Sequence, residues 1–217
     1  MILCCLMLFC SSCSSTKQTQ TDATDFLLID PGHGGFDGGA VAEDGTLEKH
    51  INLKISLFLR DMLSLCGIPV EMTRDTDIGL VVGTENTIRQ KKVNDLQRRL
   101  ALYNQAKQVI SVHQNLFSVS KYSGAQVFYS GNHPDSAVLA DCIQQSVCHQ
   151  LQPDNQREIK QASNGIYLLH HTTTPAVLVE CGFLSNPDER QRLLTESYQQ
   201  EMAFAIMMGY FTFSLEK

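Results

Sequence analysis

The sequence has no cluster of lysine and arginine. Its 217 residues include 17 basic and 23 acidic side chains, which gives a formal net charge of −6 at pH 7. Binding to nucleic acid or to an anionic membrane surface needs concentrated positive charge, so this composition argues against both kinds of partner. The hydrophobic content of 43% is enough to build the core of one globular domain.

A long apolar run is also absent. The first nine residues are mostly apolar, whereas about 20 are needed to span a bilayer. Ser11, Ser12, Cys13 and a Ser/Thr/Gln-rich stretch follow. This order is typical of a secretory signal with a flexible tether, and it predicts export to the cell envelope or beyond, with Cys13 as the lipid-carrying cysteine of a bacterial lipoprotein. Residues 1–25 are therefore assigned to a leader and 26–217 to the folded domain, unless the start is truncated or misassigned.

The cysteines of the folded domain show no C-x-x-C spacing. They are Cys66, Cys142, Cys148 and Cys181, and each lies among apolar residues. The spacing excludes a zinc ribbon, and a disulfide framework is not expected in a domain of this size. We expect buried free thiols.

Nucleotide-binding fingerprints are missing too, although the stretch "FLLIDPGHGGFDGG" (26–39) is rich in glycine. It contains neither the G-x-G-x-x-G of a dinucleotide site nor the Gly-Lys-Ser/Thr ending of a P-loop. Glycine accepts the backbone conformations of a tight loop, so these residues let the backbone pack closely around the single histidine, His33. We call residues 32–40 the Gly-rich loop.

Strand-like and helix-like stretches alternate from residue 26 onward. The expected strands are 26–30, 68–74, 108–113, 124–130, 165–169 and 176–180. The expected helices are 47–66, 90–106, 136–151, 189–194 and 199–213, with a loop over 75–87. Alternation of this kind predicts a single α/β domain, in which a twisted, mostly parallel sheet of about six strands has helices on both faces.

Two of these helices allow finer predictions. Thr46 is a plausible N-cap for helix 47–66, and Gly67 ends it. Helical spacing indicates which side chains of helix 90–106 face inward. They are Val93, Leu96, Leu100 and Tyr103.

Chemically capable side chains follow three of the strands. His33 comes just after the first, His113 closes "QVISVH", and Glu180 closes "AVLVE". If these strands are parallel, the three side chains meet at one sheet edge, which Glu48 at the start of the next helix can also reach. Two histidines and one glutamate are a known catalytic zinc set, which leaves the other carboxylate free to act as a base. The remaining histidines are interpreted as surface or loop residues: His50, His133, His149, His170 and His171.

Five motifs occur in an order typical of a known enzyme family. They are "IDPGHGGFDGGA", "TLEKHINLKIS", "MTRDTD", "SVHQN" and "PAVLVECGFLSNPDE". Together they resemble the zinc-dependent N-acetylmuramoyl-L-alanine amidases of bacterial cell-wall turnover, over about residues 26–214. The stretches "SGAQVFYS" and "NGIYLLHHTTTPAVLVECGFLSNPDERQRLL" are most similar to the sporulation-type branch, often called CwlD.

The resemblance implies that His33, Glu48 and His113 bind one Zn²⁺ per chain and that Glu180 is the catalytic acid/base. Asn115 would line the site. Peptidoglycan would be the substrate, cut between N-acetylmuramic acid and the L-alanine of the stem peptide in cell-wall or spore-cortex remodelling.

The sequence departs from the family pattern in two places. Gln108-Val109 stands where the family often has an Asp before the "SVH" strand. His170 stands where many members have an Arg after "LL", and this second difference concerns substrate contacts. The autoinhibitory helix of some relatives has no counterpart between His113 and Glu180, so control must come from elsewhere, for which an activating protein partner is one candidate.

Two other functions remain compatible with the motifs. A zinc exopeptidase acting on free cell-wall peptides could use the same ligands, and it would need a carboxylate-binding arginine, for which Arg74 and Arg157 are candidates. A non-catalytic peptidoglycan-binding lipoprotein is the other, but it would be expected to lack some of the four site residues.

Overall fold

Six strands form one sheet in the order β2-β1-β3-β6-β4-β5. The computed structural model describes residues 25–81 and 87–216. The strands are β1 (Leu27–Pro31), β2 (Val70–Met72), β3 (Gln108–Asn115), β4 (Gln126–Tyr129), β5 (Lys160–Gln161) and β6 (Ala176–Phe183). The helices are α1 (Glu48–Leu65), α2 (Ile88–Tyr103), α3 (Asp135–Gln150), α4 (Tyr167–His171), α5 (Pro187–Leu193) and α6 (Glu196–Leu215). The fold predicted from the sequence is confirmed.

The centre of the sheet is parallel. β2, β1, β3 and β6 run in the same direction, whereas β4 is antiparallel to β6 and carries β5 parallel to itself. Every residue of β1 is buried, as are most residues of β3 and β6. Near-continuous apolar runs are what strands covered on both faces require. We call the edge where β1, β3 and β6 end the carboxyl edge.

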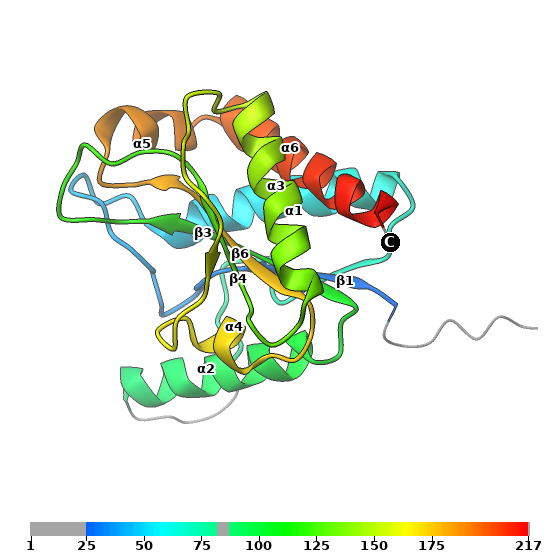
Figure 1. Cartoon of the computed structure of the whole chain (residues 1–217). Coiled ribbons are helices and arrows are strands. Elements are labelled where there is room, and N and C mark those ends of the chain that lie inside the picture. Colours follow the sequence, from blue (N-terminus) through cyan, green and yellow to red (C-terminus); the bar gives the residue numbers. More distant parts are fainter. Residues whose placement is uncertain (1–24, 82–86, 217) are drawn as a thin grey trace, which may run out of the picture.

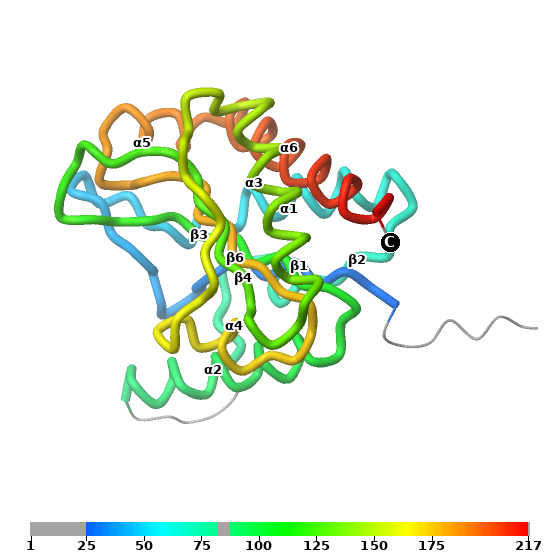
Figure 2. Tube along the Cα trace, viewed as in Figure 1, coloured from blue at the N-terminus to red at the C-terminus, as the bar shows by residue number. Residues whose placement is uncertain are grey.

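Helices cover the two faces of the sheet unequally. α1, α3 and α6 pack together over one face and enclose the larger apolar core. α2 and α4 cover the other face and a smaller core around Leu28, Val109 and Leu178. Figure 1 and the trace in Figure 2 show these two layers on opposite sides of the strands. The predicted coverage of both faces is therefore confirmed.

The Gly-rich loop caps the N-terminus of α1. The N-cap residue is Leu47, which makes no side-chain cap bond, so the prediction of Thr46 as N-cap is wrong. The backbone N–H groups of Glu48 and Lys49 donate instead to the carbonyls of Ala40 (3.0 Å) and Gly38 (3.2 Å). Backbone carbonyls of the loop thus satisfy N–H groups that a capping side chain would otherwise serve. Gly67, at φ 79°, follows the end of the helix as predicted.

α2 buries a charged stripe. Its buried residues are Asp95, Arg99 and Tyr103, whereas Val93 is 46% exposed, so the prediction of Val93 as an inward residue is wrong. The inward prediction is confirmed for Tyr103, which is fully buried, and for Leu96 and Leu100, which are partly buried against the smaller core. Polar side chains share this face of the helix. The helix therefore packs on the sheet through hydrogen bonds as well as apolar contacts.

Arg99 is the centre of that packing. Its guanidinium pairs with Asp30 of β1 and donates to Asp95 (2.6 Å) and to the carbonyls of Pro31 (3.1 Å) and His33 (2.7 Å). The hydroxyl of Tyr103 donates to the second carboxylate oxygen of Asp30 at 2.6 Å. Burial alone would raise the pKa of Asp30, but Arg99 and the hydrogen bonds hold it well below its usual range. The pair is therefore a fully ionised contact inside the protein.

Two further predictions differ from the structure. The stretch 165–169, expected as a strand, contributes to helix α4, and the edge strand β5 lies before it. An apolar run this short does not distinguish a strand from a buried helical turn. Cys66 is exposed rather than buried, although Cys142 and Cys181 are buried and all four thiols of the described chain are free.

The predicted leader, including Cys13, lies outside the described residues and stays a prediction. Among the helices that the structure describes, none combines the length and apolar character that crossing a membrane requires.

Arg99→Met should destabilise the domain by about 3–5 kcal/mol, because it leaves the Asp30 carboxylate buried without its partner. Arg89→Met, at an exposed position of the same helix, should change little. Urea unfolding of both variants at pH 7 measures the difference. Since the pKa of Asp30 is lowered from 3.8, the contribution of the pair is present above about pH 4 and is lost as the pH falls below it. Equal stability of the two variants at pH 7 would contradict this account.

Candidate active site

His33 is held in a strained backbone conformation at the start of the Gly-rich loop. Its φ of 62° is the only positive value among the described non-glycine residues. The Arg99 guanidinium holds its carbonyl, and its Nδ1 lies 2.9 Å from Oδ2 of Asp37. Lys92 of α2 contacts the other oxygen of Asp37 at 2.9 Å. These contacts fix the imidazole with Nε2 directed toward Glu48, 3.2 Å away.

Two glycines make room for the imidazoles. A Cβ added to Gly32 would lie 2.2 Å from the ring of His113, and one added to Gly39 would lie 2.5 Å from Oε2 of Glu48 and 2.6 Å from the ring of His33. Gly39 also has φ +70°, which favours glycine. The close backbone packing around His33 predicted from the sequence is what the structure shows.

Glu48 lies between the two histidines. Only 3% of the residue is exposed. Its carboxylate accepts hydrogen bonds from the backbone N–H groups of Ala40 (2.7 Å) and Gln114 (3.0 Å) and from Nδ2 of Asn52 (3.1 Å). Nδ1 of His113 lies 2.9 Å from Oε1. The rings of His33 and His113 meet edge to face, with their centroids 5.0 Å apart.

The cluster favours charged side chains. Burial would raise the pKa of Glu48, but hydrogen bonds with His113 and His33 hold it well below its usual range. Burial would lower the pKa of His33, yet the hydrogen bonds to Asp37 and Glu48 outweigh it and raise that pKa to about 9. A cation bound between these groups would therefore have to displace a proton from His33.

Three atoms of this cluster match a metal site. His33, Glu48 and His113 each offer one ligand atom, and the three atoms lie within 4.8 Å of one another. Two imidazole nitrogens and one carboxylate oxygen are a ligand set that zinc accepts in catalytic sites. The contact of Asp37 with the far nitrogen of His33 is the kind of support that orients a metal-binding histidine. The donor set therefore fits a zinc ion.

Glu180 lies beside the cluster on the neighbouring strand. It is opposite His113 in the parallel pairing of β3 with β6, so both side chains are on the same face of the sheet. Its Oε2 is buried and has no hydrogen-bond partner among the described residues. Burial, followed by the charge of Glu48, raises the pKa of Glu180 to about 8. A carboxyl group with this pKa can hold a proton at neutral pH, and its orphaned oxygen again suits a cationic neighbour.

The three other candidate residues are Asn115, Arg74 and Arg157, and they lie in three different surroundings. Asn115 ends β3 opposite Phe183, and its carbonyl accepts from Leu184 N at 2.8 Å. Arg74 is buried behind the Gly-rich loop, where its guanidinium donates to four backbone carbonyls. Arg157 lies near the carboxyl edge, with Nη1 3.4 Å from Oε1 of Gln126. Arg74 is thus committed to the loop, whereas Arg157 is not.

Sequence reasoning missed several residues that support the site. Asp37, Lys92 and Asn52 contact the cluster or its immediate neighbours. Arg99 holds the carbonyl of His33, and the backbone N–H of Gln114 donates to the Glu48 carboxylate. Asp37 could have been found, because an acid four residues after a loop histidine can fold back onto it. Asn52 lies four residues after Glu48 on one helix and Gln114 follows His113 directly, so both were also within reach of local reasoning. Lys92 and Arg99 come from the distant α2 and carry no local signal.

Known proteins with the same fold and motifs are amidases. Residues 27–210 match the family model described as N-acetylmuramoyl-L-alanine amidase. The germination-specific N-acetylmuramoyl-L-alanine amidase of Bacillus subtilis is 38% identical over 193 residues, which cover 88% of this chain and 80% of that protein.

Solved structures agree with this assignment. The CwlD amidase from Clostridioides difficile, solved in complex with the GerS lipoprotein, is 39% identical with a TM-score of 0.86 and covers 89% of this chain and 100% of its own. The amidase AmiC2 of Nostoc punctiforme has a TM-score of 0.74 at 26% identity and covers 88% of this chain and 97% of its own. The resemblance seen in the motifs is confirmed: this chain belongs to the N-acetylmuramoyl-L-alanine amidase family.

Proposed function

We propose that this chain hydrolyses the amide bond between the lactyl group of N-acetylmuramic acid and the L-alanine of the peptidoglycan stem peptide. One observation carries the proposal: in a chain of this family, a His33–Glu48–His113 cluster lies at the carboxyl edge of the sheet, with Glu180 opposite His113 on the next strand. Ligands of open α/β sheets bind at this edge.

We propose that His33, Glu48 and His113 hold one Zn²⁺ per chain. When bound there, zinc supplies a Lewis acid for the amide carbonyl and lowers the pKa of a coordinated water to about 7. The protein's part is to hold the three ligands in place: Asp37 orients His33, and three N–H groups hold the carboxylate of Glu48.

Glu180 is proposed to move the proton. Its carboxylate takes a proton from the attacking water and delivers it to the nitrogen of the departing L-alanine, because an amide anion is a poor leaving group. Burial and the charge of Glu48 raise the pKa of Glu180 to about 8 in the metal-free protein. A cation bound beside it would lower that pKa, so that the carboxylate is ionised when it accepts the proton. Asn115, at the end of the strand that carries His113, is proposed to line the substrate site.

The names of two relatives bear on where in the cell this chain acts. The Bacillus subtilis relative is named as germination-specific, and the Clostridioides difficile relative was solved with a lipoprotein partner. We propose that this chain acts on peptidoglycan outside the cytoplasm in cell-wall or spore-cortex remodelling. An activating protein partner and membrane attachment through a lipidated Cys13 belong to the same proposal.

The zinc-loaded protein should release intact stem peptides from peptidoglycan and leave a free tetrapeptide uncut. Mass spectrometry of muropeptides before and after treatment measures both reactions. A chelator should abolish the release, and added zinc should restore it. Shortened free tetrapeptide with unchanged muropeptides would instead identify an exopeptidase, and binding without any cleavage would identify a non-catalytic protein.

Metal binding and proton transfer should separate in variants. His33→Ala, Glu48→Ala and His113→Ala each remove a ligand, so they should purify with substoichiometric zinc and be inactive. Glu180→Gln should keep about one zinc per chain and lose roughly 10²–10⁴-fold in rate, the usual contribution of a general acid/base. Metal analysis and amidase assays test this, with exposed His50→Ala and Glu43→Gln as controls. If Glu180→Gln loses its zinc while Glu48→Gln keeps both its zinc and its activity, the two roles are exchanged: Glu180 would be the zinc ligand and Glu48 the acid/base.

A lipid on Cys13 should retain the native protein in the membrane fraction of its own cells. Cys13→Ala should release the protein or leave its leader unprocessed, as membrane fractionation and intact mass would reveal. An unmutated protein found entirely in the soluble fraction would refute lipidation, while still allowing export through a cleaved signal.

A further inference from the structure

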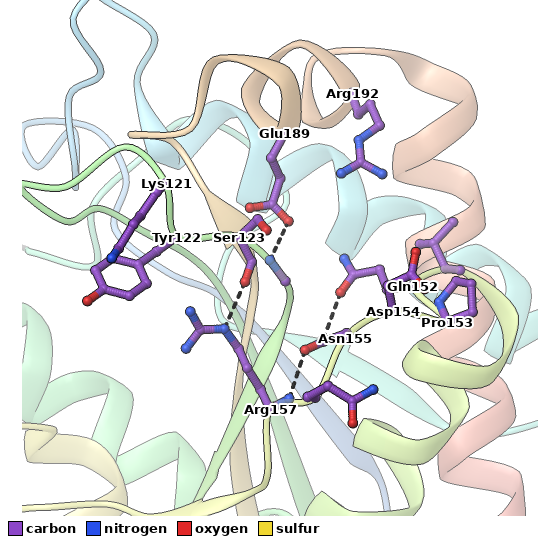
Figure 3. A pocket seen from close by; sticks show the side chains of 13 residues that line it. Lys121, Tyr122, Ser123, Gln152, Pro153, Asp154, Asn155, Arg157, Glu189 and Arg192 are labelled. Carbon is purple, nitrogen blue, oxygen red and sulfur yellow. Dashed lines mark hydrogen bonds between the residues drawn. The ribbon is translucent and has the colours of Figure 1, made fainter.

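A cavity of about 530 Å³ lies near the carboxyl edge. Its walls come from the loop before β4, the loop after α3, and α5 (Figure 3). Because β4 runs antiparallel to β6, the start of β4 lies beside the end of β6 that carries Glu180. The cavity therefore opens on the same edge as the proposed active site. We call it the Arg157 pocket.

The guanidinium of Arg157 is held in a single place. Its Nε donates to the carbonyl of Ser123 at 2.9 Å, and Nη1 lies 3.4 Å from Oε1 of Gln126. The guanidinium carbon lies 4.6 Å from the ring centroid of Phe183, a residue only 3% exposed. Figure 3 shows the side chain extending toward Ser123 along one wall of the pocket. An arginine fixed in this way loses little conformational freedom when it binds a ligand.

Arg157 has no carboxylate partner among the residues that the structure describes. The pocket lining contains two carboxylates, Asp154 and Glu189, and neither forms an ion pair with Arg157. The two oxygens of Glu189 accept from the backbone N–H groups of Gly124 (2.9 Å) and Phe183 (2.7 Å). Burial also raises the pKa of Glu189. Lys121 and Arg192 add further positive charge to the lining. The pocket thus presents a fixed, unpaired guanidinium, which suits a planar carboxylate.

Gln126 connects this pocket to the proposed active site. It is directly opposite Glu180 in the antiparallel pairing of β4 with β6, so the two side chains are neighbours on one face of the sheet. Arg157 contacts the side chain of Gln126. One side chain therefore separates the Arg157 guanidinium from the residue proposed to protonate the leaving group.

We propose that Arg157 binds a carboxylate of the stem peptide, on the leaving-group side of the cut amide, and so selects which stem peptides are cleaved. The inference rests on the proposed function, since it assigns the pocket to the peptide half of that substrate. Arg157 is a specificity residue in this assignment, and the proton transfer stays with Glu180.

Paired substrates test the assignment. One is a muramoyl-L-alanyl peptide with an acidic second residue, and the other is the same molecule with that free carboxylate amidated. The unmutated enzyme should favour the acidic substrate by roughly 10- to 100-fold in kcat/KM, mainly through KM, as expected for hydrogen bonds to a charged group. Arg157→Gln should lose this preference, because its kcat/KM for the acidic substrate should fall to its own value for the amidated one.

Two variants distinguish the effect of the planar guanidinium of Arg157 from the effect of positive charge alone. Arg157→Lys keeps the charge without the planar fork and should retain only part of the preference. Arg192→Gln removes a cation from the opposite wall of the pocket. The guanidinium carbon of Arg192 lies 5.4 Å from the ring centroid of Tyr198. An equal loss of preference in Arg192→Gln would overturn the assignment to Arg157. Thermal unfolding of each variant identifies any that fail to fold.

Binding provides a measurement that needs no turnover. Calorimetry with chelator-treated protein compares the free L-alanyl peptide that has an acidic second residue with its amidated form. The acidic peptide should bind to the unmutated protein more tightly than its amidated form does. Arg157→Gln should bind the two peptides equally. Equal binding of both peptides would overturn the inference, whether or not the enzyme cuts the parent amide. If neither muramoyl substrate is cleaved but the acidic peptide still binds more tightly than its amidated form, the proposed function would be rejected. The assignment of Arg157 as a carboxylate-binding residue would stand.

Discussion

The buried pairing of Arg99 with Asp30 is the contact on which the geometry of the site depends. Arg99 reaches from α2 across the end of β1 and binds the carbonyls of Pro31 and His33 as well as the carboxylate. Arg74 binds the carbonyls of Pro31 and Gly32 on the same stretch of chain. A loop with positive φ at three successive residues cannot make ordinary ladder hydrogen bonds, so two buried guanidinium groups satisfy its carbonyls instead.

The electrostatics of the site come from two carboxylates in opposite environments. Glu48 accepts three N–H hydrogen bonds and faces two imidazoles, which favours its charged form. Glu180, about one strand spacing away, has a buried oxygen without any such donor in the described chain, which favours its neutral form. Separation of two carboxyl pKa values by their surroundings is how enzymes assign different tasks to the same functional group.

The sequence was sufficient to predict five of the six strands and the meeting of four side chains, because apolar runs that end in His or Glu mark buried strands and their termini. It was insufficient where backbone carbonyls, buried polar side chains or a very short element decided the outcome. Thr46 lost the N-cap position to carbonyls of the Gly-rich loop, and Val93 lost its inward place because α2 buries Asp95 and Arg99 instead. Helix α4 was mistaken for a strand because its five residues are too few to show a period.

The link between the Gly-rich loop and α1 has a consequence for how the site moves. Ala40 and Glu48 bind each other twice, once through backbone groups at 3.0 Å and once from Ala40 N to the Glu48 carboxylate at 2.7 Å. Neither segment can open without breaking both bonds, so the loop and the first turn of the helix behave as one cooperative unit. A local opening that breaks these bonds would therefore disturb the positions of Glu48 and His33 together.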